Sequence, residues 1–167
     1  MALNLEQASG LNAVFAVASA GAALTGISGA ASTYSTSAFG YAINGVLAAK
    51  ASVAGGVTPV IDGNTQVAFP AIGINQAAAV VWSINAAGLI AVSKGPTVAW
   101  TNTNVASTVL QLPSTPSGYV AFAYHLIQNG AAGSAFTIGT SLWNATGVTL
   151  PTVVNVAQLP NAGLTSL

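Results

Sequence analysis

The feature that most constrains the fold is an apolar run enclosed by turn residues, within the segment from Pro116 to Thr140. Gly118 lies two residues after a proline, a combination that lets the chain reverse just before the run begins. The run, Tyr119 to Gln128, has no formal charge and mixes aromatic with aliphatic residues, which is typical of a β-strand. Asn129-Gly130 predicts a turn, so the segment is expected to form a β-hairpin with Phe136 to Thr140 as its second strand.

Strict alternation along this run predicts two faces that are both mainly apolar. The sets expected on the two faces are Tyr119, Ala121, Ala123, His125 and Ile127, and Val120, Phe122, Tyr124, Leu126 and Gln128. A strand that is covered on both faces lies inside a sheet, with the core on one side and another layer or subunit on the other.

Short apolar runs separated by turn signals continue from Ser37 onward. Asn44-Gly45 predicts a two-residue hairpin, and Ala77 to Ser93 predicts two strands joined by Asn85 to Gly88. Further strands are expected at Val46 to Ala51, at Val57 to Ile61 after a turn at Ala54 to Gly56, at Val67 to Ile74, at Thr97 to Thr101, at Val105 to Leu112 and at Val148 to Val156. This spacing of strands and turns predicts an antiparallel β-sandwich or jelly-roll-like domain over residues 37–167.

Residues 1–36 differ from the rest because they are rich in Ala, Gly, Ser and Thr. The uncharged stretch from Leu11 to Ala31 is long enough to span a bilayer. Its polar residues, and Glu6 in place of a preceding Lys or Arg, argue against a membrane segment. We therefore expect an extended N-terminal arm, or a strand pair, that makes assembly contacts.

Charged side chains are rare: the chain has Lys+Arg 2 and Asp+Glu 2, where ordinary soluble domains have about 25% charged residues. The four are Glu6, Lys50, Asp62 and Lys94. Such a surface has no basic stripe for nucleic acid. It also has no charge repulsion to keep copies apart, so we expect self-association. Stability is expected to be nearly flat in pH and in salt.

No group of residues predicts a catalytic, cofactor-binding or metal site. His125 is the only histidine, and a catalytic histidine needs a nucleophile and an orienting partner. The only carboxylates are Glu6 and Asp62, and the chain has no cysteine. We therefore interpret His125 as a strand residue that is hydrogen-bonded within a sheet or a subunit contact, and we expect no enzyme activity and no cofactor.

The tryptophans suggest one alternative kind of ligand. Trp82, Trp100 and Trp143 could stack on sugars, as in a carbohydrate-binding tail or fibre module. Such a platform normally has acidic or polar companions that orient the sugar, and these are scarce here. We expect the three rings to fill the core or an interface.

Several turn and strand motifs together resemble a known class of protein. They are Pro116, Gly118, Tyr124, Asn129-Gly130, Phe136, Gly139-Thr140 and Gly147-Val148-Thr149, with Tyr41-Ala42-Ile43-Asn44-Gly45 and Phe69-Pro70-Ala71 upstream. Over residues 37–150 the chain resembles small tailed-phage virion structural proteins that decorate or cement the head shell or form head fibres.

This resemblance implies a β-sandwich that oligomerises, commonly as a trimer, and grips the major capsid protein on the capsid surface of the virion. It implies neither a nucleic-acid partner nor a membrane. The alternatives are a self-assembling filament or sheath subunit completed by strand exchange, and the carbohydrate-binding module.

Overall fold

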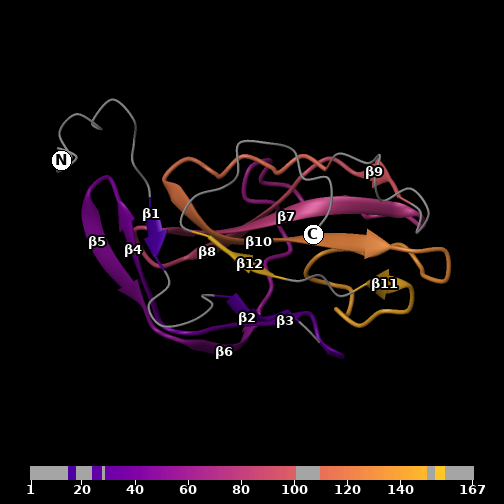
Figure 1. Ribbon diagram of the computed structural model, residues 1–167, viewed down its shortest axis with the longest axis horizontal. Helices are drawn as coiled ribbons and strands as arrows, with labels where there is room; N and C mark the ends of the chain where they lie inside the picture. The colour runs from indigo at the N-terminus through magenta and orange to yellow at the C-terminus, as the bar shows by residue number, and fades with distance from the viewer. Residues whose placement is uncertain (1–14, 18–23, 28, 101–109, 150–152, 157–167) are drawn as a thin grey trace.

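The computed structural model describes residues 15–17, 24–27, 29–100, 110–149 and 153–156. All its regular elements are strands, and every pair of neighbouring strands is antiparallel (Figure 1). No helix occurs among these residues. The predicted fold class, an all-β antiparallel sandwich, is confirmed.

The main sheet has six strands and is organised on its two longest, which pair along their whole length. Its strand order is β11-β10-β7-β8, with β12 on β10 and β9 on β7. The bounds are β7 (Gln76–Asn85), β8 (Ile90–Lys94), β9 (Val98–Ala99), β10 (Tyr119–Asn129), β11 (Val148–Thr149) and β12 (Val154–Asn155). The predicted strand pair within Ala77 to Ser93 corresponds to β7 and β8.

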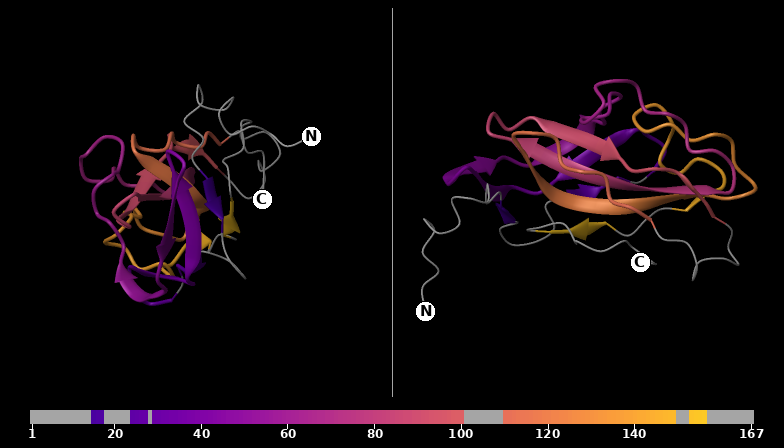
Figure 2. Two further views of the ribbon diagram at one scale, coloured as in Figure 1. Left: turned by 90° about the vertical axis from the view of Figure 1, so that its left-hand side faces the viewer. Right: turned by 90° about the horizontal axis from the view of Figure 1, so that it is seen from above.

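Two three-stranded sheets complete the fold, in the orders β1-β4-β5 and β2-β3-β6. The bounds are β1 (Phe15–Val17), β4 (Phe39–Ile43), β5 (Val46–Lys50), β2 (Leu24–Gly26), β3 (Thr33–Thr36) and β6 (Val53–Val57). In Figure 1, β2, β3 and β6 lie below the main sheet and β4 and β5 lie at its left end; Figure 2 gives the same arrangement from two further sides. The chain passes from β5 to β6 through Ala51 and Ser52, so one continuous segment forms an edge of both small sheets.

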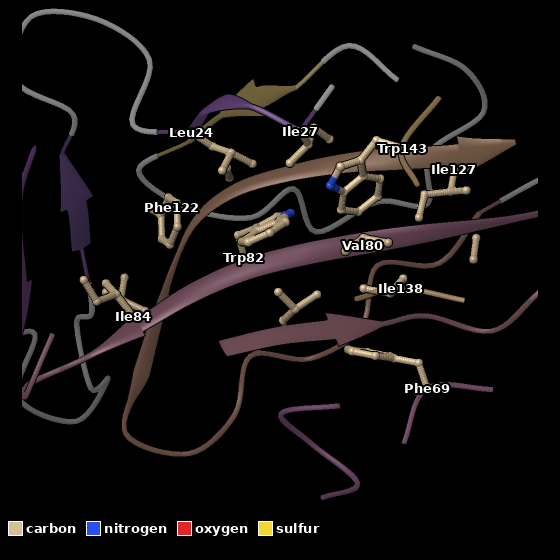
Figure 3. Packing of buried hydrophobic residues seen from close by; sticks show 14 of the residues in the cluster. Leu24, Ile27, Phe69, Val80, Trp82, Ile84, Phe122, Ile127, Ile138 and Trp143 are labelled. Carbon is tan, nitrogen blue, oxygen red and sulfur yellow. The ribbon is translucent and has the colours of Figure 1, made fainter. Parts of the chain in front are cut away.

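The core lies against one face of the main sheet (Figure 3). Trp82, Val80 and Ile84 of β7 pack there with Phe122 and Ile127 of β10. Side chains from outside the main sheet close the cluster, among them Leu24, Ile27, Phe39, Tyr41, Phe69, Phe136, Ile138 and Trp143. The described parts of residues 1–36 therefore contribute to this core through Leu24 and Ile27.

The opposite face of β7 and β10 is covered as well. Leu126 packs with Trp100 and Leu110, and Tyr124 packs near Val154 of β12. The predicted burial of the central strand on both faces is confirmed, and within the described residues the second cover comes from the chain itself.

The predicted alternation along β10 is wrong in its first half. The register with β7 shifts between Ala121 and Ala123, which is a β-bulge. A bulge places two residues opposite one, so the strand changes faces there. Val120 and Phe122 consequently join Ala123 in the main core, while Ala121 packs on the other face with Tyr124.

The turn predictions have mixed outcomes. Asn44-Gly45 joins β4 to β5, and its φ values of 51° and 78° are those of a tight hairpin turn, as expected. The expected returning strand Phe136 to Thr140 is absent, because Phe136 makes only an isolated bridge with Ile72. The Gly130 N–H instead bonds to the Gly147 carbonyl at 2.8 Å, which brings β11 beside β10.

Strand positions between residues 53 and 74 also differ from expectation. β6 includes Gly55 and Gly56, which were expected to form a turn, and it ends at Val57. The expected strand from Val67 to Ile74 is reduced to single bridges at Ala68 and Ile72. Most of the expected strand from Val105 to Leu112 lies outside the described residues.

Within their described parts, residues 1–36 contain three strands. β1 pairs with β4, β2 pairs with β3, and β3 pairs with β6. The remainder of that range, including most of the stretch from Leu11 to Ala31, lies outside the described residues. Within the part that is described, no helix is long and apolar enough to cross a membrane.

Candidate functional site

His125 lies in the middle of β10, opposite Val80, and is fully buried. Its Nδ1 is 3.4 Å from the Leu126 carbonyl oxygen, which suits an Nδ1–H donor and leaves Nε2 as an acceptor. Nε2 has no hydrogen-bond partner in the described structure. Burial lowers the pKa of His125 to about 4, against the opposing effect of the Leu126 carbonyl, so the ring is neutral at pH 7.

Aromatic rings surround this histidine rather than acid–base partners. The Trp143 ring meets it edge-on at 79° with centroids 5.8 Å apart, and the Trp82 centroid lies at 6.4 Å. No described hydroxyl or carboxylate is hydrogen-bonded to the imidazole. The ring therefore packs as part of the core, in the structural role that the sequence suggested.

Asp62 is buried, and its hydrogen bonds within the described residues are to the main chain. Oδ1 accepts the N–H groups of Asn64 at 2.8 Å and Thr65 at 3.1 Å, and Oδ2 accepts the N–H of Lys94 at 2.8 Å. This carboxylate closes its own turn and fastens that turn to the end of β8. Glu6, the other carboxylate of the sequence, lies outside the described residues.

Both lysines also bond to carbonyl groups of the chain. The Lys50 ammonium donates to the Gly88 carbonyl at 2.8 Å, and the Lys94 ammonium donates to the Gly95 carbonyl at 3.0 Å. Partial burial lowers the pKa of Lys94, and the negative charge of Asp62 works in the opposite direction. Among the described residues, no three His, Asp or Glu side chains group together as metal ligands would.

The three tryptophans are all buried, with 0%, 6% and 1% of their surfaces exposed at Trp82, Trp100 and Trp143. A sugar needs an accessible ring face for stacking, so these rings form no carbohydrate platform in this structure. The Nε1–H of Trp143 donates to the Thr33 carbonyl at 2.9 Å, which ties the ring to β3.

Asn129 has a larger structural role than the turn position that the sequence assigned to it. It is the last residue of β10, fully buried, and its Nδ2 group lies 3.0 Å from the Ile72 carbonyl, 3.2 Å from that of Gly73 and 2.8 Å from that of Ser134. Two N–H bonds shared among three carbonyls join two loops to the end of the main sheet.

The surface feature that the structure adds is a set of exposed large apolar side chains. They are Val46, Leu47, Val57, Val60, Ile61, Val67, Ile74, Leu89 and Leu142. Leu47 is the most exposed of them, at 85%, and it neighbours Val46 at 68% in β5. The sequence signal was available, because two large aliphatic residues directly follow the Asn44-Gly45 turn.

The charged side chains and the exposed apolar side chains thus have different roles in this structure. Within the described residues, the side chains of Lys50, Asp62 and Lys94 bond to the main chain, and the accessible surface includes many apolar side chains. Such a surface is suited to contact with other macromolecules. The sequence matches no family model, and neither a curated protein nor a solved structure matches it at a significant level.

Proposed function

We propose that this protein is a non-enzymatic structural component of a phage virion, which decorates or cements the capsid by binding the major capsid protein and its own copies. The resemblance of residues 37–150 to head decoration and head-fibre proteins suggests this class, and a trimer is its usual assembly. The protein would lie on the outer capsid surface.

The observation that carries the proposal is the exposure of large apolar side chains on a chain with almost no charge. Burying apolar surface contributes about 25 cal/mol per Å², which is the main source of affinity available to such a protein. Long-range steering by charge is weak, so binding is expected to depend little on ionic strength.

A sedimentation experiment tests capsid binding directly. Purified protein is mixed with heads assembled without it and then centrifuged, with an unrelated β-sandwich protein as control. We expect saturable co-sedimentation at a fixed copy number relative to the major capsid protein, unchanged between 50 and 300 mM salt. Recovery of the protein in the supernatant at every ratio would overturn capsid decoration.

A filament or sheath subunit is the second candidate, and the outer edge of β5 favours it. No other described strand pairs with that edge, and exposed edges can accept a strand from another copy. Negative-stain microscopy of the purified protein separates the two functions, because long fibres support the filament and small closed assemblies support the decoration protein.

A further inference from the structure

We infer that two copies of this chain pair through the outer edges of their β5 strands, antiparallel and about a two-fold axis at Ala48. The inference rests on the self-association that belongs to the proposed function, and it names one two-fold contact, which joins copies in pairs and is separate from the three-fold contact of a trimer. It is carried by the geometry of the β4–β5 hairpin and by the side chains along β5.

The hairpin register leaves specific backbone groups free. Its two-residue turn makes Ile43 and Val46 a hydrogen-bonded pair, and such pairs alternate along an antiparallel ladder. Ala48 and Lys50 therefore bond to β4, whereas the N–H and C=O groups of Leu47 and Ala49 point away from it. In the described structure no strand lies on that side of β5.

A second copy of the same strand satisfies these groups completely. Placing Ala48 opposite Ala48 of the second copy sets Leu47 opposite Ala49 of the second copy, and the reverse. Each of these two pairs exchanges two N–H···O bonds. The central alanines then form the non-hydrogen-bonded pair, in which Cα atoms approach to about 4.5 Å, a spacing that suits small side chains.

Charge does not oppose this pairing. Lys50 is the only charged residue of β5, and its ammonium donates to the Gly88 carbonyl, so it does not block pairing at the strand edge. In the paired arrangement the two copies of Lys50 lie four residue steps apart, about 13 Å along the strands, which exceeds the screening length of roughly 8 Å at physiological salt.

The neighbouring edge of β6 is less suitable, although it continues the same segment. Its ladder with β3 is irregular, because the N–H groups of Val53 and Gly55 bond to the hydroxyl oxygens of Thr36 and Ser35 of β3, and Gly55 has a φ of 65°. An edge with that conformation cannot offer a regular ladder. The β5 edge also has the most exposed apolar side chain, because Leu47 is 85% accessible.

Cross-linking of the full-length protein tests the register. The natural chain has no cysteine, so Ala48→Cys introduces a single thiol. Cβ atoms of directly opposed residues lie about 4.5 to 5.5 Å apart, within reach of a disulfide after small adjustment. Under mild oxidation we expect Ala48→Cys to form a reducible dimer at least tenfold faster than Ile74→Cys.

Ile74 is the matched control position because it is 50% exposed and lies at the far end of the main sheet. Gln76, two residues later, pairs with Asn129 at the end of β10, on the right of Figure 1, whereas β5 is on the left. Equal cross-linking rates for the two cysteine variants would overturn the β5 contact.

Association measured by light scattering provides the second readout. Leu47→Lys adds a charge to the edge, and Ala49→Pro removes an N–H that does not bond to β4. Each is expected to raise the concentration needed for pairing at least tenfold, whereas Ile74→Lys, with the same added charge, changes it less than twofold. Circular dichroism checks that each variant is folded.

The outcomes distinguish this inference from the proposed function. If the natural protein associates, and neither β5 variant weakens association more than Ile74→Lys does, the β5 contact is wrong while self-association stands. If the natural protein stays monomeric at all concentrations, both the β5 contact and the self-association are wrong. Capsid binding is decided separately, by the sedimentation experiment.

Discussion

The indole of Trp143 donates its Nε1–H to the carbonyl oxygen of Thr33 at 2.9 Å, across 110 positions of sequence. This bond joins the loop after β10 to strand β3, and it places the Trp143 ring edge-on to His125 at the centre of the core. The bond is partly buried, and a hydrogen bond of this kind contributes about 0.5 to 1.5 kcal/mol to stability.

Trp143→Phe is therefore expected to destabilise the protein more than Trp82→Phe does. Both rings are buried, but the Nε1–H of Trp82 has no partner in the described structure. Both variants lose similar volume, and only Trp143→Phe also loses a hydrogen bond. We expect the free energy of unfolding of Trp143→Phe, from urea titration, to be about 0.5 to 1.5 kcal/mol below that of Trp82→Phe. Equal losses would contradict the structural role of the bond to Thr33.

His125 predicts one departure from pH-independent stability. Burial lowers its pKa to about 4 in the folded protein, from an ordinary value of about 6.5. Below pH 6.5 the unfolded chain takes up a proton that the folded protein does not, so stability is complete above pH 6.5 and falls toward pH 4. The total loss is about 3 kcal/mol, and the decline levels off below the folded pKa.

The measurement is the free energy of unfolding at intervals between pH 8 and pH 3.5, with His125→Phe as the control. An aromatic ring without an ionisable nitrogen removes this contribution, so the difference between the two curves should have the slope and range stated above. Parallel curves would show that His125 does not titrate differently in the folded and unfolded states.

Asn129→Ala is expected to lower the free energy of unfolding by about 2 to 4 kcal/mol, because the carbonyls of Ile72, Gly73 and Ser134 lose a shared donor. Asn144→Ala is the matched control, since that side chain is exposed, and should change stability by less than about 0.5 kcal/mol. Chemical denaturation of both variants gives the comparison. Similar small effects would mean that the loops hold their positions without Asn129.

Salt should have almost no effect on stability. The sequence has Lys+Arg 2 and Asp+Glu 2, so few charge pairs exist to be screened. We expect the free energy of unfolding to change by less than about 0.5 kcal/mol between 20 and 300 mM sodium chloride, measured at pH 7.5, where His125 is neutral. A larger change would reveal charge interactions that involve residues outside the described part.

Local signals explain what could be predicted from the sequence. The Asn44-Gly45 turn, the strand pair β7–β8 and the long apolar strand β10 are all specified within short windows, and the structure contains them. The structural interpretation of His125 was also accessible, because a lone histidine without nearby carboxylates lacks the partners of a catalytic group.

The remaining differences arise from long-range pairing. Asn129-Gly130 does signal a reversal of the chain. The strand that then pairs with β10 is set by the hydrogen bond between Gly130 and Gly147, which are 17 positions apart, so a short stretch of sequence cannot predict it. Gly55 and Gly56 favour a turn by propensity, yet β3 recruits them into a strand. The free backbone edge of β5 depends on β5 being the last strand of its sheet, which is a property of the whole topology.

The bulge between Ala121 and Ala123 has a consequence for folding fidelity. A uniformly alternating β10 could slide by two positions along β7 and still present apolar residues to both sides. If the bulge kept its place opposite Trp82, a slide by two positions would turn Phe122 out of the main core or turn Tyr124 into it. The bulge therefore favours a single register between two long apolar strands that have no charged residues to select one.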